Sequence, residues 1–299
     1  MNSKWLMSIV CALFALLALG GCCEPADEPV IIDVPEGEAG VRHSIVGTSI
    51  ENRAIECLMV GEGQDVTFIL TAIHGDEPAG IPLVYRLAKY LRQCPHLLQG
   101  RKVVLLPVAN PDGVAHNNRL NARGVDLNRN FPTANRINNA VHGYAAISEP
   151  EARVIEQLIG EYAPERIVSI HQLTDTGPEA LSHRVPKGCI DYDGPAKALA
   201  ERMAEYCDLP VEKLGAAPGS LGAYTGLTLG IGIITVELPR YAEWLGSERL
   251  WEQYGAALIA AVVYPEAVKQ EQHERGAVTS GAATFLRRLQ DTTGRSSLR

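Results

Sequence analysis

Residues 66–78 read VTFILTAIHGDEP, an apolar run that passes without a break into a polar turn. The run 66–73 is rich in β-branched residues, which is typical of a strand buried in a sheet. The helical pattern that follows, 78–91, starts on Pro78, and proline is favoured at the first helical position. The stretch therefore predicts a strand whose carboxyl end delivers His74 and Glu77 to the turn before a helix.

The same alternation of strand and helix recurs along the chain. Further strands are predicted at 102–108, 166–170 and 231–236, and further helices at 149–162, 195–206 and 247–264. The helix at 149–162 is introduced by SEPE at 148–151, a pattern typical of an amino-terminal cap. The alternation favours the α/β class, with a doubly wound, mostly parallel or mixed sheet and helices on both faces. Ligands of such folds bind outside the carboxyl ends of the strands.

The amino terminus predicts export with a lipid anchor. An apolar stretch at 5–19 is short for a membrane span, which needs about 20 residues, and it ends in LGGC at 19–22. This ending resembles a bacterial lipobox, which implies lipidation of Cys22 and, in a Gram-negative organism, an outer-membrane protein facing the periplasm; elsewhere the cell surface is implied. The alternatives are an uncleaved anchor helix or a plain secretory signal. We therefore expect a signal peptide at 1–21, a tether at 22–40, a catalytic domain at 41–265 and an extension at 266–299.

Composition narrows the function classes. The chain has 299 residues, of which 46% are hydrophobic, as in an ordinary globular protein, and a formal net charge of −8. No cluster of Lys and Arg lies in the body of the chain, which excludes nucleic acid as a partner. The 7 cysteines are scattered, and Cys189 with Cys207 is a candidate disulfide in an exported protein.

Three residues at predicted strand ends form a candidate metal site. His171 follows the strand at 166–170, so it is expected at the same sheet edge as His74 and Glu77. Imidazole nitrogens and a carboxylate oxygen are normal zinc ligands, and a catalytic zinc keeps three protein ligands and a water. A histidine and a glutamate three residues apart are more often a solvated pair, but their placement at two strand ends predicts one zinc ion per chain.

Glu237 is the candidate general base. It ends the apolar run 232–236, where a carboxylate can accept a proton from a water molecule and pass it to a leaving amine. Without the other motifs it would be an ordinary surface glutamate at a strand end.

The segment RLNARGVDLNRNFP at 119–132, preceded by NPDG at 110–113, is poor in core-forming residues and rich in Asn and Arg. Guanidinium groups bind carboxylates in pairs of hydrogen bonds and stabilise oxyanions. The segment predicts a loop that holds an anionic peptide end. A loop tied down by its asparagine side chains explains the asparagines but not the arginines.

Taken together, HGDE, NPDG, GVDLNRNFP, the strand ending in His171 and TVELP resemble the zinc carboxypeptidase family over residues 66–240. The resemblance implies a zinc metallocarboxypeptidase in which Arg119 polarises the scissile carbonyl. It also implies that Asn128 and Arg129 hold the free carboxylate of the substrate.

Within the family, SEPE at 148–151, DYDGPA at 191–196 and PGSLGAY at 218–224 are similar to murein peptide amidases. This implies a peptidoglycan-derived substrate, cut between γ-D-glutamate and meso-diaminopimelate, whose ammonium group Asp191 or Asp193 could meet. Two rivals are a zinc deacylase resembling succinylglutamate desuccinylase or aspartoacylase, and a catalytically silent, wall-binding lipoprotein.

One departure concerns a tyrosine that digestive carboxypeptidases place a few residues before a Gly-Ser turn. This chain reads LGAAPGS at 214–220 and has no tyrosine there. Tyr224 follows the turn, and it either contributes to substrate binding or packs in the core.

Overall fold

The computed structural model describes residues 40–174 and 185–265. The predicted signal peptide with Cys22, most of the tether and the carboxyl-terminal extension lie outside these residues. Among the described residues, no helix combines the length and the apolar character that crossing a membrane requires.

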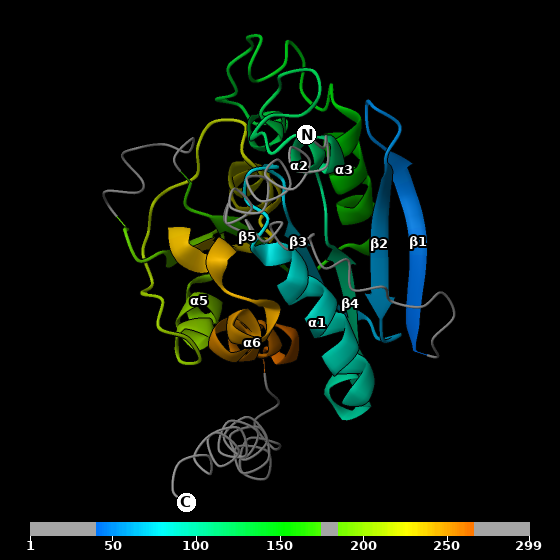
Figure 1. The fold of residues 1–299 in the computed structure, drawn as a ribbon, viewed down its shortest axis with the longest axis vertical. Coiled ribbons are helices and arrows are strands. Elements are labelled where there is room, and N and C mark those ends of the chain that lie inside the picture. Colours follow the sequence, from blue (N-terminus) through cyan, green and yellow to red (C-terminus); the bar gives the residue numbers. More distant parts are fainter. Residues whose placement is uncertain (1–39, 175–184, 266–299) are drawn as a thin grey trace, which may run out of the picture. The chain divides into compact units, whose positions relative to one another are not determined.

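A seven-stranded sheet forms the centre of the described chain, in the order β1-β2-β4-β3-β5-β7-β6 (Figure 1). The strands are β1 (Val41–Thr48), β2 (Ala54–Val60), β3 (Asp65–Thr71), β4 (Arg101–Leu106), β5 (Arg166–Gln172), β6 (Cys189–Asp193) and β7 (Gly232–Leu238). The helices are α1 (Gly80–Gln93), α2 (Pro111–Ala115), α3 (Pro150–Tyr162), α5 (Lys197–Ala204) and α6 (Ser247–Val263). Short helical turns lie at Pro95–Leu98, Leu127–Arg129 and Arg240–Trp244, and a π-helical turn at Ala223–Leu229.

The sheet is mixed, which confirms the predicted α/β class. Strands β4, β3, β5 and β7 run parallel to one another, whereas β1, β2 and β6 join the sheet by antiparallel pairing. The four parallel strands are those that the apolar runs predicted. The pattern did not single out β1 and β6, because β1 has no buried residue and the short β6 carries two aspartates. The buried, apolar β2 was also missed.

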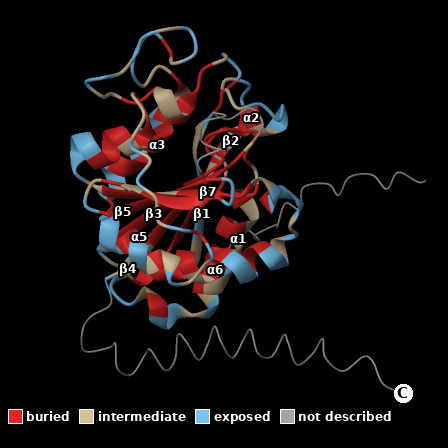
Figure 2. Cartoon of the chain, turned by 90° about the vertical axis from the view of Figure 1, so that its left-hand side faces the viewer, coloured by how far each residue is buried: buried red, intermediate tan, exposed pale blue. Residues whose placement is uncertain are grey.

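Each face of the sheet packs against its own helices (Figure 2). On one face, Ile69 of β3 belongs to a core shared with α1, α5 and α6, while Phe68 and Leu70 point into a second core shared with α3. Successive side chains of a strand face opposite sides of the sheet, so burial on both faces requires an uninterrupted apolar run. This is why residues 66–73 show no alternation of polar and apolar residues.

The parallel strands bring the chemically active residues to one edge. Thr71 pairs in register with Ile170, and His171 pairs with Glu237. The carboxyl ends of β3, β5 and β7 therefore lie side by side, and the residues that follow β3 share an edge with His171 and Glu237.

The predicted disulfide between Cys189 and Cys207 is wrong. Cys207 is a thiol whose Sγ lies 3.7 Å from the Met203 carbonyl oxygen, one helical turn earlier, and Cys189 is fully buried on β6. The spacing of cysteines along the chain carries no information on which of them meet.

The turn after β3 depends on a close approach between two glycines. A Cβ atom placed on Gly75 would lie 1.9 Å from the backbone carbon of Gly113. Gly113 is itself fixed, because its N–H donates to the Asn110 side chain at the start of α2 over 2.9 Å. Glycine at position 75 thus lets the turn that carries His74 and Glu77 pack onto α2.

We predict that Gly75→Ala displaces this turn, lowering the free energy of unfolding by about 1–3 kcal/mol and weakening metal binding. Urea unfolding and a zinc titration measure the two effects. Gly160→Ala in α3 is the matched control, because its Cβ meets no atom within 4 Å and alanine favours the helix. Equal behaviour of the two variants would show that the glycine contact is dispensable.

Candidate active site

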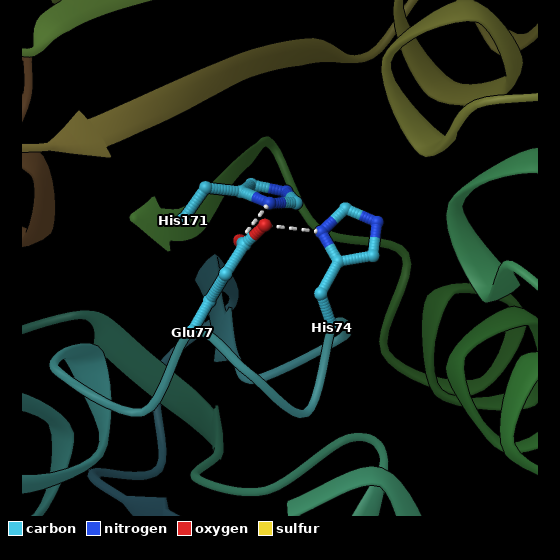
Figure 3. Close-up of side chains that lie close together, drawn as sticks. All are labelled: His74, Glu77 and His171. Atoms are coloured by element: carbon cyan, nitrogen blue, oxygen red, sulfur yellow. Dashed lines mark hydrogen bonds and ion pairs between the residues drawn. The ribbon is translucent and has the colours of Figure 1, made fainter. Parts of the chain in front are cut away.

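The three predicted metal ligands meet at the sheet edge (Figure 3). His74 Nδ1 lies 2.8 Å from Glu77 Oε1, and His171 Nδ1 lies 2.8 Å from Glu77 Oε2. One ligand atom from each of the three residues lies within 4.8 Å of the others, and all three residues are buried.

His74 and His171 use their Nε2 atoms for contacts outside the triad, which leaves both Nδ1 atoms available to a shared ligand. His74 Nε2 lies 3.2 Å from Asp126 Oδ1, and His171 Nε2 lies 3.1 Å from Ser169 Oγ. Metal-bound histidines usually hold their second ring nitrogen in this way, which fixes the ring orientation. Two imidazole nitrogens and one carboxylate oxygen facing a common point are a donor set that fits zinc.

Opposite charges balance one another inside the site. Burial opposes ionisation of the Glu77 carboxyl, but the imidazoles of His74 and His171 outweigh it and bring its pKa well below the usual range. Burial likewise opposes the charged form of His74, yet the carboxylates of Glu77 and Asp126 raise its pKa to about 9. A buried carboxylate that faces two imidazole nitrogens is suited to bind a divalent cation.

Asp126 connects the arginine-rich loop, residues 119–132, to this site. It begins the helical turn Leu127–Arg129 by accepting the Asn128 N–H over 2.9 Å. Arg119 donates through Nε to Asp126 Oδ2 over 3.2 Å and through a terminal nitrogen to Glu77 Oε1 over 3.1 Å. The sequence motif contained Asp126, but its contacts with His74 and Arg119 were missed, because they depend on how the loop folds against the turn after β3.

Two further buried carboxylates, those of Glu149 and Glu151, hold the same loop in place through Asn121. Asn121 accepts the N–H groups of Arg123 and Val125 and donates to Glu149 Oε2 over 2.8 Å and Glu151 Oε2 over 3.2 Å. The SEPE segment was predicted to cap α3, yet its side chains make no cap hydrogen bond. Two of its residues bind the loop instead.

A cavity of about 330 Å³ adjoins the triad. Its lining includes seven candidate residues and both aspartates of the predicted ammonium site: His74, Glu77, Arg119, Asn128, Arg129, His171, Glu237, Asp191 and Asp193. Of the candidates within the described residues, only Tyr224 is not part of the lining. Small and aliphatic residues form another wall, among them Leu214, Ala216 and Ala217. No tyrosine lines the cavity among the described residues.

Glu237 lies at the end of β7 beside His171. Its side chain is buried, and burial raises the pKa of its carboxyl; the charge of Glu77 adds to this, while His171 opposes it. A carboxylate with a raised pKa is a stronger base. Its position at the cavity suits proton transfer.

Tyr224 lies in the core and not at the cavity. Its ring stacks on Phe131, with ring centroids 5.8 Å apart and an angle of 13° between the planes. Burial, with a smaller effect from Glu156 of α3, raises the pKa of its hydroxyl. Of the two roles that the sequence left open for Tyr224, the structure supports packing.

The chain is similar in sequence to known proteins. A family model described as zinc carboxypeptidase matches residues 39–176. Murein peptide amidase A of Escherichia coli K12 is 34% identical over 199 residues, which cover 60% of this chain and 74% of that protein. Mouse carboxypeptidase M is 34% identical over 120 residues, which cover 32% of this chain and 27% of that protein.

Solved structures agree on the fold. The murein-tripeptide amidase of E. coli O157 superposes with a TM-score of 0.57 at 25% identity, covering 77% of this chain and 94% of that one. Bovine thrombin-activatable fibrinolysis inhibitor superposes with a TM-score of 0.61 at 16% identity, covering 83% of this chain and 92% of that one. The second likeness concerns the fold alone.

We predict that Asp126→Asn weakens zinc binding about 10–100-fold, because the charge that orients the His74 ring is lost. Competition with a chromogenic chelator measures the dissociation constant. Asp65→Asn is the matched control, since Asp65 begins β3 at the opposite end and pairs with Arg166 over 2.6 Å. Unchanged zinc affinity in Asp126→Asn would remove its assigned role.

Proposed function

Since this chain belongs to the zinc carboxypeptidase family, a family of hydrolytic enzymes, we propose that it is a murein peptide amidase. Family membership confirms the sequence-based prediction of an enzyme. The proposed reaction is hydrolysis of the amide bond between γ-D-glutamate and meso-diaminopimelate in cell-wall-derived peptides.

One observation carries the proposal: a single cavity contains a zinc-type donor set, a buried carboxylate base and two side chains suited to bind a carboxylate. The choice of a murein peptide is supported by the 34% identity that covers most of murein peptide amidase A. The segment that resembles this branch, 191–196, contributes Asp191 and Asp193 to the same cavity.

The protein's own residues divide the work of amide hydrolysis. A zinc ion held by His74, Glu77 and His171 would supply a Lewis acid and lower the pKa of water at the site. Glu237 accepts a proton from the attacking water and returns it to the leaving nitrogen. Arg119 donates to the carbonyl oxygen as negative charge develops there.

Asn128 and Arg129 are proposed to hold the substrate carboxylate. Asn128 Oδ1 accepts the Leu221 N–H over 2.8 Å, so its amide nitrogen is the end that donates elsewhere. Burial lowers the pKa of Arg129, which indicates a guanidinium whose lost hydration its surroundings do not fully replace. A carboxylate would compensate both groups with charge-assisted hydrogen bonds.

We also propose that the mature protein is exported and anchored through a lipid on Cys22, at the outer membrane facing the periplasm in a Gram-negative organism. The amino-terminal sequence supports this proposal, and a location facing the wall gives access to peptidoglycan fragments. Hydrolysis there would serve wall remodelling or scavenging.

We predict that Glu237→Gln lowers kcat at least about 1,000-fold with zinc retained, because glutamine cannot accept the proton. The assay incubates the zinc-loaded domain without residues 1–22 with L-Ala-γ-D-Glu-meso-diaminopimelate and detects diaminopimelate by mass spectrometry. Glu156→Gln, at an exposed position of α3, is the control. An active Glu237→Gln variant would sink the base assignment, and an inactive zinc-bound wild type would refute the proposed substrate.

The lipid anchor predicts that Cys22→Ser abolishes incorporation of labelled palmitate and releases the full-length protein from the membrane fraction. Cys23→Ser, one residue later, is the matched control and should keep the label. Label retained in Cys22→Ser and lost in Cys23→Ser would place the lipid on the neighbouring residue.

A further inference from the structure

The end of the cavity formed by β6 carries negative charge. Asp191 and Asp193 both line the cavity, with only 5% and 4% of their surface exposed. Asp191 pairs in register with Thr235, which also lines the cavity, and Cys189 pairs with Glu237. The Asp191 side chain therefore lies on the same face of the sheet as Thr235 and Glu237, on the neighbouring strand. It is two residues, or about 6.6 Å along the strand, away from the level of Glu237.

The two aspartates differ in their partners. Asp193 Oδ1 forms an ion pair with Lys213 Nζ. Asp191 Oδ1 accepts two backbone N–H groups, from Tyr192 over 2.8 Å and from Leu214 over 2.9 Å. None of the ion pairs within residues 40–174 and 185–265 includes Asp191.

Asp191 therefore has an oriented carboxylate that forms no ion pair with the side chains the structure describes. Burial raises the pKa of its carboxyl and the charge of neighbouring Asp193 adds to the effect, while the two backbone hydrogen bonds and the more distant charge of Lys213 oppose it. A buried carboxylate of this kind gains most from a cation that enters with a ligand. Its second oxygen is the one that the two backbone groups leave available.

Building on the proposed function, we infer that Asp191, and not Asp193, binds the side-chain ammonium of the residue released by hydrolysis. The site selects a leaving residue that carries an amine at the end of a flexible aliphatic stem. Diaminopimelate carries such an amine, on a distal carbon that also bears a carboxylate.

The remaining walls suit such a stem. With the substrate carboxylate held by Asn128 and Arg129, the side chain of the leaving residue extends from the position of Glu237 towards Asp191. The path is bordered by Ala216, Gly222 and Thr235, whose small side chains leave room for methylene groups. A side chain without an amine would leave Asp191 buried and unpaired, which is the basis of the discrimination.

The test is a double-mutant cycle between enzyme and substrate. Wild type and Asp191→Asn are each assayed on L-Ala-γ-D-Glu-meso-diaminopimelate and on the matched peptide ending in L-2-aminopimelate, which has the same stem without the amine. Asparagine keeps Oδ1 as the acceptor for both backbone N–H groups, so the fold is expected to persist. On the first peptide the variant should lose about 100-fold in kcat/KM, mainly through KM.

On the aminopimelate peptide the same variant should change by less than about threefold, because no ammonium is present to lose its partner. Asp193→Asn is the matched control. It should lower kcat/KM by the same factor on both peptides, since Asp193 pairs with Lys213. Equal losses on both peptides in Asp191→Asn would overturn the inference. A peptide-selective loss confined to Asp193→Asn would also overturn it.

A binding measurement separates this inference from the proposed function. If wild type cleaves neither peptide, the proposed function fails, and calorimetry with free meso-diaminopimelate and 2-aminopimelate then decides the role of Asp191. Preferential binding of diaminopimelate that disappears in Asp191→Asn supports the ammonium site. Equal binding of the two amino acids to wild type refutes it.

Discussion

The buried carboxylate of Glu77 is the interaction on which the rest of the site depends. It meets His74 and His171 through separate oxygens, and it also accepts from Arg119 and from the Gln172 N–H. A charge removed from water is stable only when such partners surround it. Because these partners come from the turn after β3, from β5 and from the arginine-rich loop, one carboxylate brings three distant segments together.

The fold supplies the geometry that this carboxylate requires. Parallel strands end at a common edge, which places His171 beside Glu237 and close to the turn after β3. The contact between Gly75 and Gly113 sets the path of that turn, and Asn121 anchors the loop that carries Arg119. The loop support is itself a buried polar network, so the precision of the site comes from hydrogen bonds as much as from the apolar cores.

The sequence predicted what local pattern and residue chemistry determine. Apolar runs marked the parallel strands, and a histidine or glutamate at a strand end marked the triad and Glu237. Roles that arise only from contacts across the fold were missed, such as Asp126 on His74 and Glu149 on Asn121. Long-range packing also decided Tyr224, whose ring lies on Phe131, since no local pattern distinguishes a cavity tyrosine from a core tyrosine.

The cavity wall near the Gly-Ser turn is aliphatic, with Leu214, Ala216 and Ala217 in its lining. No phenolic hydroxyl lines this wall among the described residues, so in the proposed mechanism stabilisation of a developing oxyanion falls to Arg119. That guanidinium is oriented by Asp126 and Glu77, the same carboxylates that contact His74. The proposed metal-binding and oxyanion-binding groups therefore share two carboxylates, so a change that displaces Asp126 or Glu77 is expected to disturb both.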